Sequence, residues 1–399
     1  MNINTPYLII EINDEKIILL AIKYNENFDY EILDSIVTNS QGIEKGKIID
    51  VNISSSIIKK NLNQLEKKID YIFKNAIIIC DQDNYDCINI SGYKKLRGSQ
   101  ILNDDVLFIL NNIKKIIIND NQKKSLVHIF NSNFLLDHKE AKNIPIGLYG
   151  DFYNQHHSFF LLPKNDIKNI NLVANKSDIN VEKIILKNFT KGVSIIKKNN
   201  IQEKFILINL KKTSSNISIF DKSSFIYSEN FNFGSNMIIQ DIKKLCSLEH
   251  NEVINVFKEV KLDDLSNNKD KYLEEKIFSS STFRKISLDH INDIISARVK
   301  ELAELIFTKN INIKNLVNDN TVLFLSLEDT DIINSLRKNI NKIFSNDGNI
   351  KLIDYDNDTY LDSALTTAEL IGKGWEKEAI PLIQTKKTLI ARIFSGLFN

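Results

Sequence analysis

Three aspartates in the segment DYDNDTYLD are spaced like the oxygen ligands of a calcium-binding loop. Asp354, Asp356 and Asp358 alternate along the chain, as the first, third and fifth positions of such a loop do. The loop needs glycine at its sixth position for a sharp turn and glutamate at its twelfth as a bidentate ligand, but this sequence has Thr359 and Leu365 there. We therefore interpret the segment as a solvated turn and predict no metal site.

Side chains that could perform nucleophilic or acid–base chemistry are not grouped in the sequence. His156 and His157 are adjacent, and adjacent residues of a strand point to opposite faces of the sheet, so a shared metal or substrate is not expected. The sequence contains no GxSxG, P-loop or HExxH pattern. It therefore predicts no catalytic residue and favours a protein that is not an enzyme.

Two arginines, Arg284 and Arg298, are separated by fourteen residues in the segment RKISLDHINDIISARVKEL. If one helix holds both, the separation is close to four turns and places them on the same face. Such a face could bind an acidic partner, or it could be a basic surface that only contacts water.

The chain ends on the sequence TKKTLIARIFSGLFN, residues 385–399. If this stretch is helical, its bulky apolar residues share one face, and Lys386, Lys387 and Arg392 lie off that face. The apolar face comprises Leu389, Ile390, Ile393, Phe394, Leu397 and Phe398. The stretch is shorter than the ~20 residues that cross a bilayer, but a cationic amphipathic helix can lie in the headgroup region. The alternative is a terminal helix docked on its own core.

The composition indicates a globular protein without a general affinity for nucleic acid. Of 399 residues, 43% are hydrophobic, and 52 basic against 51 acidic residues give a net charge of +1. Three cysteines, Cys80, Cys87 and Cys246, lack CxxC spacing and are typical of a reducing compartment. The N-terminus does not have the pattern of a signal peptide. We expect a cytoplasmic protein that meets a membrane only at its C-terminus.

Strand pairs alternate with helical patterns along the chain. The segments YLIIEI and IILLAIKY predict a hairpin around the turn NDEK, and KFILINL and NISIFD predict a second hairpin about two hundred residues later. A further strand, TVLFLSL, follows a long helical pattern. Residues 87–163 form a separate unit with a helix, two strands and a turn at NIPIGLYG. A hairpin that opens each half predicts an α/β fold with duplicated lobes, which is the plan of the actin-like (ribonuclease H-like) fold.

Three segments resemble FtsA, the actin-like protein of bacterial cell division. Residues 126–150 are similar to the strand and turn of that family's inserted subdomain, residues 40–50 to its "s.Gi.kG.I.D" segment, and residues 284–302 to its second-lobe helix. The matching positions of the first segment are Phe134, Asp137, Asn143, Pro145, Gly147 and Gly150. The order and spacing of the segments hold over almost the whole chain.

The resemblance implies a two-lobed molecule of four subdomains and a C-terminal amphipathic helix. Residues 1–83 and 164–200 would form the first core subdomain (1A), and residues 84–163 the inserted one (1C). Residues 201–233 and 311–374 would form the second core subdomain (2A), and residues 234–310 subdomain 2B. The last core helix would end at Gly372, Lys373 and Gly374. Residues 375–399 would then form a short tether that leads into the membrane-targeting helix.

The chain departs from the family in the loops that hold ATP and Mg²⁺. Glycine-rich turns let backbone N–H groups approach phosphates, and carboxylates help to hold the metal. The aligned residues here are Asn13, Asp14, Glu15 and Lys16, then Asn209, Leu210, Lys211, Lys212, Thr213, Ser214, Ser215 and Asn216 with Gly234, and finally Ser326, Leu327 and Glu328, followed by Asp329. Two carboxylates replace phosphate-binding groups, and two amides, Asn209 and Asn216, replace the metal-binding aspartates. We expect no cofactor, although Lys211 and Lys212 leave weak binding of ATP as an alternative.

The sequence as a whole favours a non-catalytic adaptor of cell division. The resemblance implies that Arg284 and Arg298 receive the acidic C-terminal peptide of FtsZ, the tubulin-like ring protein. It also implies self-assembly, contacts with downstream division proteins, and a place on the cytoplasmic face of the inner membrane at the septum, where anionic lipids bind the tail. The alternatives are an atypical ATP-binding actin-like enzyme and a pilus-assembly adaptor of the same fold.

Overall fold

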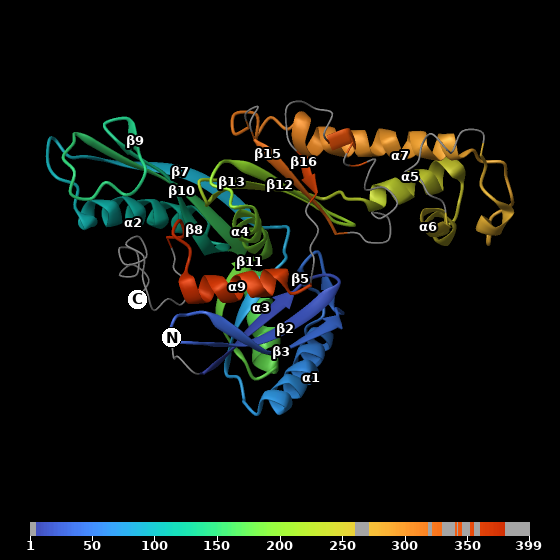
Figure 1. The fold of residues 1–399 in the computed structure, drawn as a ribbon, viewed down its shortest axis with the longest axis horizontal. Coiled ribbons are helices and arrows are strands. Elements are labelled where there is room, and N and C mark those ends of the chain that lie inside the picture. Colours follow the sequence, from blue (N-terminus) through green and yellow to red (C-terminus); the bar gives the residue numbers. More distant parts are fainter. Residues whose placement is uncertain are drawn as a thin grey trace. The chain divides into compact units, whose positions relative to one another are not determined.

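The computed structural model describes residues 5–259, 271–317, 321–328, 340, 342–344, 352–354 and 360–379. The chain divides into two compact units (Figure 1). Unit 1 comprises Met1–Glu203, Phe220–Ser228 and Asp358–Asn399, and unit 2 comprises Lys204–Ile219 and Glu229–Asn357. Each unit is described by itself below.

The core of unit 1 is a mixed five-stranded sheet. Its strands follow the order β11 (Asn180–Leu186), β6 (Asn75–Cys80), β1 (Pro6–Ile12), β2 (Lys16–Tyr24) and β3 (Tyr30–Asn39). β1, β2 and β3 pair antiparallel, whereas β6 and β11 extend the sheet in parallel. The predicted hairpin is confirmed, with Ile12 paired to Ile17 across the turn. β1, β2 and β6, which are rich in isoleucine and leucine, are buried on both faces.

Four helices cover the two faces of this sheet. α1 (Val51–Ile69) and α3 (Lys164–Lys176) pack together on one face, and α4 (Lys187–Asn199) and α9 (Asp362–Lys373) on the other (Figure 1). α1 begins where the Asp50 carboxylate accepts a hydrogen bond from the Ile53 amide at 2.9 Å, as an N-cap residue does. A two-stranded ribbon, β4 (Ile43–Glu44) and β5 (Lys47–Ile48), precedes α1.

The predicted insertion forms its own antiparallel sheet in unit 1. Its order is β7 (Asp86–Lys95), β10 (Phe152–Pro163), β8 (Lys124–Leu136) and β9 (Lys139–Ala141). α2 (Asn103–Asp120) packs against β7 and β8. A Cβ at Gly92 would lie 2.5 Å from Ile109 of α2, so glycine permits this approach of helix to strand. The helix and the two strands predicted between residues 87 and 163 are therefore confirmed.

The structure explains the sequence motif at the end of β8. Asp137 has a φ of 49°, and its Oδ1 accepts hydrogen bonds from the amides of Asp151 and Phe152, each at 2.8 Å. A Cβ at Gly150 would lie 2.3 Å from Leu136, so only glycine permits this close approach. The aspartate and the glycine of the motif thus close one turn together.

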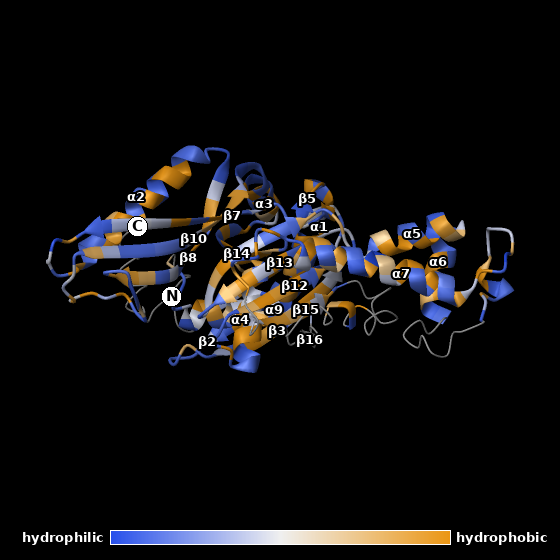
Figure 2. Cartoon of the chain, turned by 90° about the horizontal axis from the view of Figure 1, so that it is seen from above, coloured by the Kyte–Doolittle hydropathy of each residue, from blue (hydrophilic) through white to orange (hydrophobic). Residues whose placement is uncertain are grey.

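A second five-stranded sheet repeats the strand order of the first. It runs β14 (Ser224–Phe231), β13 (Ser215–Asp221), β12 (Phe205–Leu210), β15 (Val322–Leu327) and β16 (Leu352–Asp354). β12, β15 and β16 belong to unit 2, and residues 220–228 of β13 and β14 are counted with unit 1. β15 and β16 extend it in parallel beside β12, as β6 and β11 do beside β1. Figure 2 shows β12 and β15 as predominantly hydrophobic strands. The repeated order confirms the duplicated α/β architecture, and the fold is actin-like.

Among the described residues, unit 2 contains the helices α5 (Asn236–Cys246), α6 (His250–Glu259) and α7 (Leu288–Ala303), a short 3₁₀ helix η2 (Glu275–Ile277) and a π-helical segment η3 (Glu304–Thr308). The prediction of one helix that holds both arginines was conditional, and it is wrong. α7 begins after Ser287, whose hydroxyl accepts a hydrogen bond from the His290 amide, so Arg284 precedes the helix. Ser287 therefore sets the N-terminal boundary that the periodic pattern did not reveal.

The last helix also differs from its predicted place. We assigned residues 311–374 to the second core subdomain, but α9 packs on α4 and on the strands of unit 1. The Tyr24 hydroxyl of β2 donates a hydrogen bond to the Ala368 carbonyl of α9 at 2.6 Å. Long-range packing of this kind has no signal in the local sequence.

Two further predictions concern membranes and metals. Among the described residues, no helix has both the length and the apolar character that crossing a bilayer requires. Within the same part of the chain, no cluster of three or more His, Cys, Asp or Glu side chains could hold a metal ion. Asp354 ends β16, while Asp356 and Asp358 lie outside the described residues, as do Asp329 and the whole apolar tail from Lys386 to Phe398.

Candidate functional site

The first predicted nucleotide loop is the tight turn between β1 and β2. The Asn13 side chain accepts hydrogen bonds from the amides of Glu15 at 3.0 Å and Lys16 at 2.7 Å. In the family, the glycine-rich loop at this turn would present such amide N–H groups to phosphate. An asparagine oxygen therefore already accepts two of the donors that a phosphate would need.

Asp14, in the same turn, is held by the neighbouring ribbon. Its carboxylate accepts hydrogen bonds from the amides of Lys45 at 2.9 Å and Gly46 at 2.5 Å, in the turn between β4 and β5. Gly46 has a φ of 68°, and a Cβ there would lie 2.2 Å from the Asp81 carbonyl, so this position requires glycine. The acidic residue thus binds backbone amides of its own chain and adds negative charge to the turn.

Beneath this turn lies a buried ionic group that the sequence analysis missed. Lys187, at the start of α4, places its Nζ 3.0 Å from Glu11 Oε1 and 3.3 Å from Asp81 Oδ2. Glu11 is 1% exposed, and Asn13 Nδ2 also donates to its Oε1 at 2.9 Å. An ammonium group therefore lies between two carboxylates at the ends of β1 and β6.

The only local signal for this group was Glu11, a charged residue inside the apolar run YLIIEI. Its two partners are distant in sequence and are brought together because parallel strands and the following helix meet at one edge of the sheet. A lysine in this position supplies one fixed positive charge without any bound ion. We name Glu11, Asp81 and Lys187 the buried ionic triad.

The second and third predicted loops lie side by side in unit 2. β12 and β15 are parallel neighbours, with Asn209 opposite Ser326, and the Glu328 amide donates to the Leu210 carbonyl at 3.0 Å. The structure thus brings together the ends of these two loops. The first loop is in unit 1.

The turn of the second loop is closed by its own chain. The Lys211 amide donates to the Ser214 carbonyl at 3.0 Å, and the carbonyls of Lys211 and Lys212 accept from the amides of Ser235 and Asn236, which begin α5. A Cβ at Gly234 would lie 2.3 Å from the Lys211 carbonyl oxygen. Gly234 therefore lets the start of α5 approach the turn directly. Thr213, at the tip of the turn, is exposed.

Asn216, which replaces a metal-binding aspartate, belongs to a buried network. Its Nδ2 donates to the Glu229 carbonyl at 3.0 Å and to Asn230 Oδ1 at 2.6 Å, and its Oδ1 accepts from the Ser218 hydroxyl at 2.7 Å. Asn216 is fully buried. The amide needs both donors and an acceptor to be satisfied, so this position has a structural role that a carboxylate could not fill.

The two predicted FtsZ-binding arginines both contact the region of α5. Arg298 forms ion pairs with Asp241 of α5 and with Glu301, and the hydrogen bond that it donates to the Asp241 carboxylate raises the pKa of Arg298. Arg284 is exposed and donates one hydrogen bond to the Ser247 carbonyl, at the end of α5, at 2.5 Å. Arg298 is thus largely committed to partners in unit 2, whereas Arg284 presents its guanidinium at the surface.

A buried carboxylate fixes the segment that leads to Arg284. Glu252 accepts hydrogen bonds from the amides of Glu249, Ser280 and Ser281 at 2.8 Å and from the Ser281 hydroxyl at 2.7 Å. Burial of the carboxylate opposes ionisation, but these hydrogen bonds outweigh it and lower the pKa of Glu252 to about 2. The charged carboxylate therefore ties residues 280–281 to α6.

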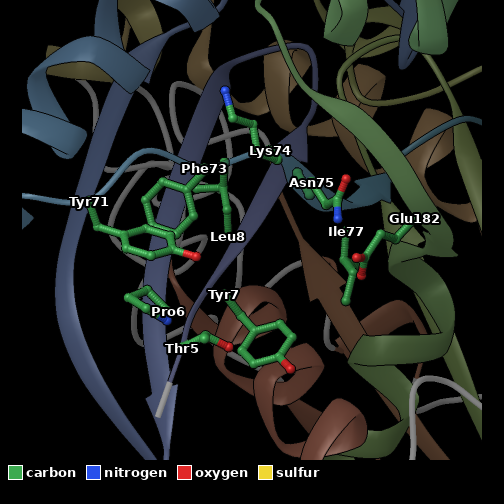
Figure 3. A pocket seen from close by; sticks show the side chains of 11 residues that line it. Thr5, Pro6, Tyr7, Leu8, Tyr71, Phe73, Lys74, Asn75, Ile77 and Glu182 are labelled. Carbon is green, nitrogen blue, oxygen red and sulfur yellow. The ribbon is translucent and has the colours of Figure 1, made fainter. Parts of the chain in front are cut away.

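A cavity of about 370 Å³ opens at the other end of β1 (Figure 3). Tyr7, Tyr71 and Phe73 line it together with Lys74 and Glu182. The residues of the first nucleotide loop follow the opposite end of the strand and take no part in this cavity. Its lining thus differs from the site that the sequence analysis proposed.

Comparison with known proteins gives one recurrent name. The chain is 19% identical over 301 residues to the cell division protein FtsA of Buchnera aphidicola subsp. Acyrthosiphon pisum, which covers 74% of this chain and 71% of the relative. It is 18% identical over 276 residues to FtsA of Agrobacterium fabrum, and the match covers 67% of this chain and 61% of the relative. FtsA of Helicobacter pylori strain J99 is 20% identical over 231 residues, 53% of this chain and 46% of the relative. No protein-family model matches the chain.

Among solved structures, a chain of the PilM–PilN type IV pilus biogenesis complex is similar, with a TM-score of 0.55 and 8% sequence identity. The similarity covers 92% of this chain and 98% of that one. At this identity the likeness concerns the fold alone. The resemblance to FtsA that the sequence motifs indicated is confirmed by the named relatives.

Proposed function

We propose that this actin-like relative of FtsA is a non-catalytic adaptor that holds FtsZ filaments on the cytoplasmic face of the inner membrane at the division site. The observation that carries the proposal is the state of the aligned nucleotide loops, which are occupied by hydrogen bonds of the chain itself. The matches to proteins named FtsA, together with the order of the motifs along the chain, support the cell-division role.

The adaptor needs no bound nucleotide in this scheme. Lys187 supplies positive charge to Glu11 and Asp81, and the asparagine oxygens of the two turns accept hydrogen bonds from backbone and side-chain donors of the chain. Because these contacts are all intramolecular, we expect the core of each unit to need neither ATP nor Mg²⁺. Each tail binds anionic lipid weakly, and self-assembly then raises the overall membrane affinity through avidity.

ATP with Mg²⁺ is therefore expected not to bind with micromolar affinity, and hydrolysis should stay at the background rate. Asp14 and Glu15 would place negative charge beside the phosphates, and Asn209 and Asn216 cannot replace metal-binding carboxylates. Isothermal titration calorimetry measures the binding, and release of phosphate measures the hydrolysis. A dissociation constant in the micromolar range or below would favour the alternative of an atypical ATP-binding enzyme.

The acidic C-terminal peptide of FtsZ should bind unit 2 near Arg284. Arg284→Glu is expected to weaken binding of the peptide at least about fivefold. The substitution replaces attraction by repulsion, and an exposed ion pair of this kind contributes ~1 kcal/mol to the binding free energy. Arg298→Glu should weaken binding too, with an added effect from its lost ion pairs to Asp241 and Glu301. Fluorescence anisotropy of a labelled peptide, at low and high salt, measures both.

Arg97→Glu is the matched control for this experiment. Arg97 is an exposed arginine of the inserted subdomain, so its reversal changes the net charge by the same amount at another place. If all three variants bind the peptide equally, the arginines form a solvated basic face. The pilus-assembly alternative, which has the same fold, predicts the same equality and also predicts that the C-terminal tail does not bind lipid.

A further inference from the structure

The chain does not become a free tether when α9 ends. α9 stops at Gly374, which has a φ of 74°, and Figure 1 shows the chain turning from there toward β8. Residues 375–379, WEKEA, were expected to begin the tether, but Trp375, Glu378 and Ala379 are buried in unit 1. We name these five residues the strap.

The backbone of the strap extends the inserted sheet. The Asn131 amide of β8 donates to the Lys377 carbonyl at 2.9 Å, and the Ala379 amide donates to the Ile129 carbonyl at 2.7 Å. These bonds make an antiparallel bridge between Phe130 and Glu378. β10 pairs with β8 along its whole length, so the strap occupies the opposite edge of β8, which β9 covers only at residues 134–136.

A buried side-chain pair fastens the strap. Glu378 Oε1 lies 2.6 Å from His128 Nδ1, and both side chains are completely inaccessible to solvent. The Leu186 amide donates to His128 Nε2 at 3.1 Å, so that nitrogen carries no proton. The imidazole is therefore neutral with its proton on Nδ1, which donates to the Glu378 carboxylate.

Two further contacts hold the ends of the strap. The Trp375 indole N–H donates to the Ser223 carbonyl at 2.7 Å, and Ala379 is part of the hydrophobic core of the inserted subdomain. Lys183 of β11 adds positive charge within electrostatic reach of Glu378. Among the described residues, the titratable groups that act on the Glu378 carboxylate are thus His128 from β8 and Lys183 from β11.

We propose that the strap fixes the point at which the C-terminal tail leaves the protein, and that His128 and Glu378 are its positioning residues. The proposal rests on the membrane role of the tail and deepens it. With the strap docked, only residues 380–384 lie between the strap and the cationic segment, and five residues span at most about 17 Å. With the strap released, residues 375–384 could span about 35 Å. The docked strap therefore holds the inserted sheet close to the lipid surface.

Hydrogen exchange of the full chain in solution tests whether the strap is fastened as described. Glu378→Gln should raise the exchange rates of the Ala379 and Asn131 amides at least about tenfold. It weakens the hydrogen bond from His128 and puts an amide N–H in place of Glu378 Oε2, which has no hydrogen-bond partner among the described residues. Glu376→Gln is the matched control, because it makes the same change on an exposed carboxylate of the strap and should leave both rates unchanged.

Neutron reflectometry on an anionic supported bilayer tests the positioning role, which stability alone would not affect. Glu378→Gln should move the protein layer up to about 17 Å farther from the lipid, and Glu376→Gln should not. Unchanged exchange at Ala379 in Glu378→Gln, or an unchanged distance, would overturn the proposal. If neither variant nor the native chain binds the bilayer, the membrane role itself fails, while the exchange experiment still reports on the strap.

Discussion

Truncation after Gln384 is expected to abolish sedimentation of the protein with anionic vesicles and to leave its melting temperature unchanged. The deleted residues 385–399 carry three cations and six bulky apolar residues on a predicted helical face. Each cation contributes about 1 kcal/mol on an anionic surface, and partial burial of the apolar face adds a few kcal/mol. The proposal assigns residues 385–399 to the lipid surface and not to the core, so their removal should leave the core of unit 1 intact.

Point substitutions separate the apolar face from the rest of the tail. Ile393→Glu and Phe394→Glu should abolish binding, because each places a carboxylate where the helix would meet acyl chains. Ser395→Glu introduces the same charge off the apolar face and should retain most of the binding. Vesicles without anionic lipid should sediment little protein. Retained sedimentation of the truncated chain, with a melting temperature lowered by several degrees, would instead support a terminal helix docked on its own core.

Replacing Lys187 by methionine should destabilise the protein by about 3–5 kcal/mol, the usual cost of removing one partner from a buried ion pair. The loss leaves the carboxylates of Glu11 and Asp81 close together without a cation, in a site where Glu11 is 1% exposed. Urea unfolding followed by circular dichroism measures the change. This effect would be the largest that we expect from a single substitution in unit 1.

Lys198→Met is the control for this experiment. Lys198 is on the same helix, α4, and pairs with Asp362 at 2.7 Å, but its side chain is 42% exposed. Water screens such a pair, so the loss should be within about 1 kcal/mol. Equal losses in the two variants would mean that the triad contributes no more than a surface pair, and that Lys187 has no special role at the eroded site.

The sequence by itself determined the strands, the duplicated plan and the insertion. Alternating runs such as YLIIEI and KFILINL with short polar turns specify hairpins locally, and the paired hairpins predicted two similar lobes. The motif around Asp137 and Gly150 was also readable, because a turn with a left-handed aspartate and a tightly packed glycine depends on residues close in sequence. Local physical chemistry is sufficient for features of this range.

Only the tertiary structure decided which unit holds α9, where α7 begins, and that the strap is buried. The same is true of the buried ionic triad, whose members come from β1, the end of β6 and the start of α4. A charged residue such as Glu11 or Glu378 is costly to bury alone, so its place is set by whichever partner the fold brings within hydrogen-bond distance. Those partners, Lys187 and His128, are 176 and 250 residues away in sequence. No local pattern encodes such a pairing, because it exists only once the sheets have formed.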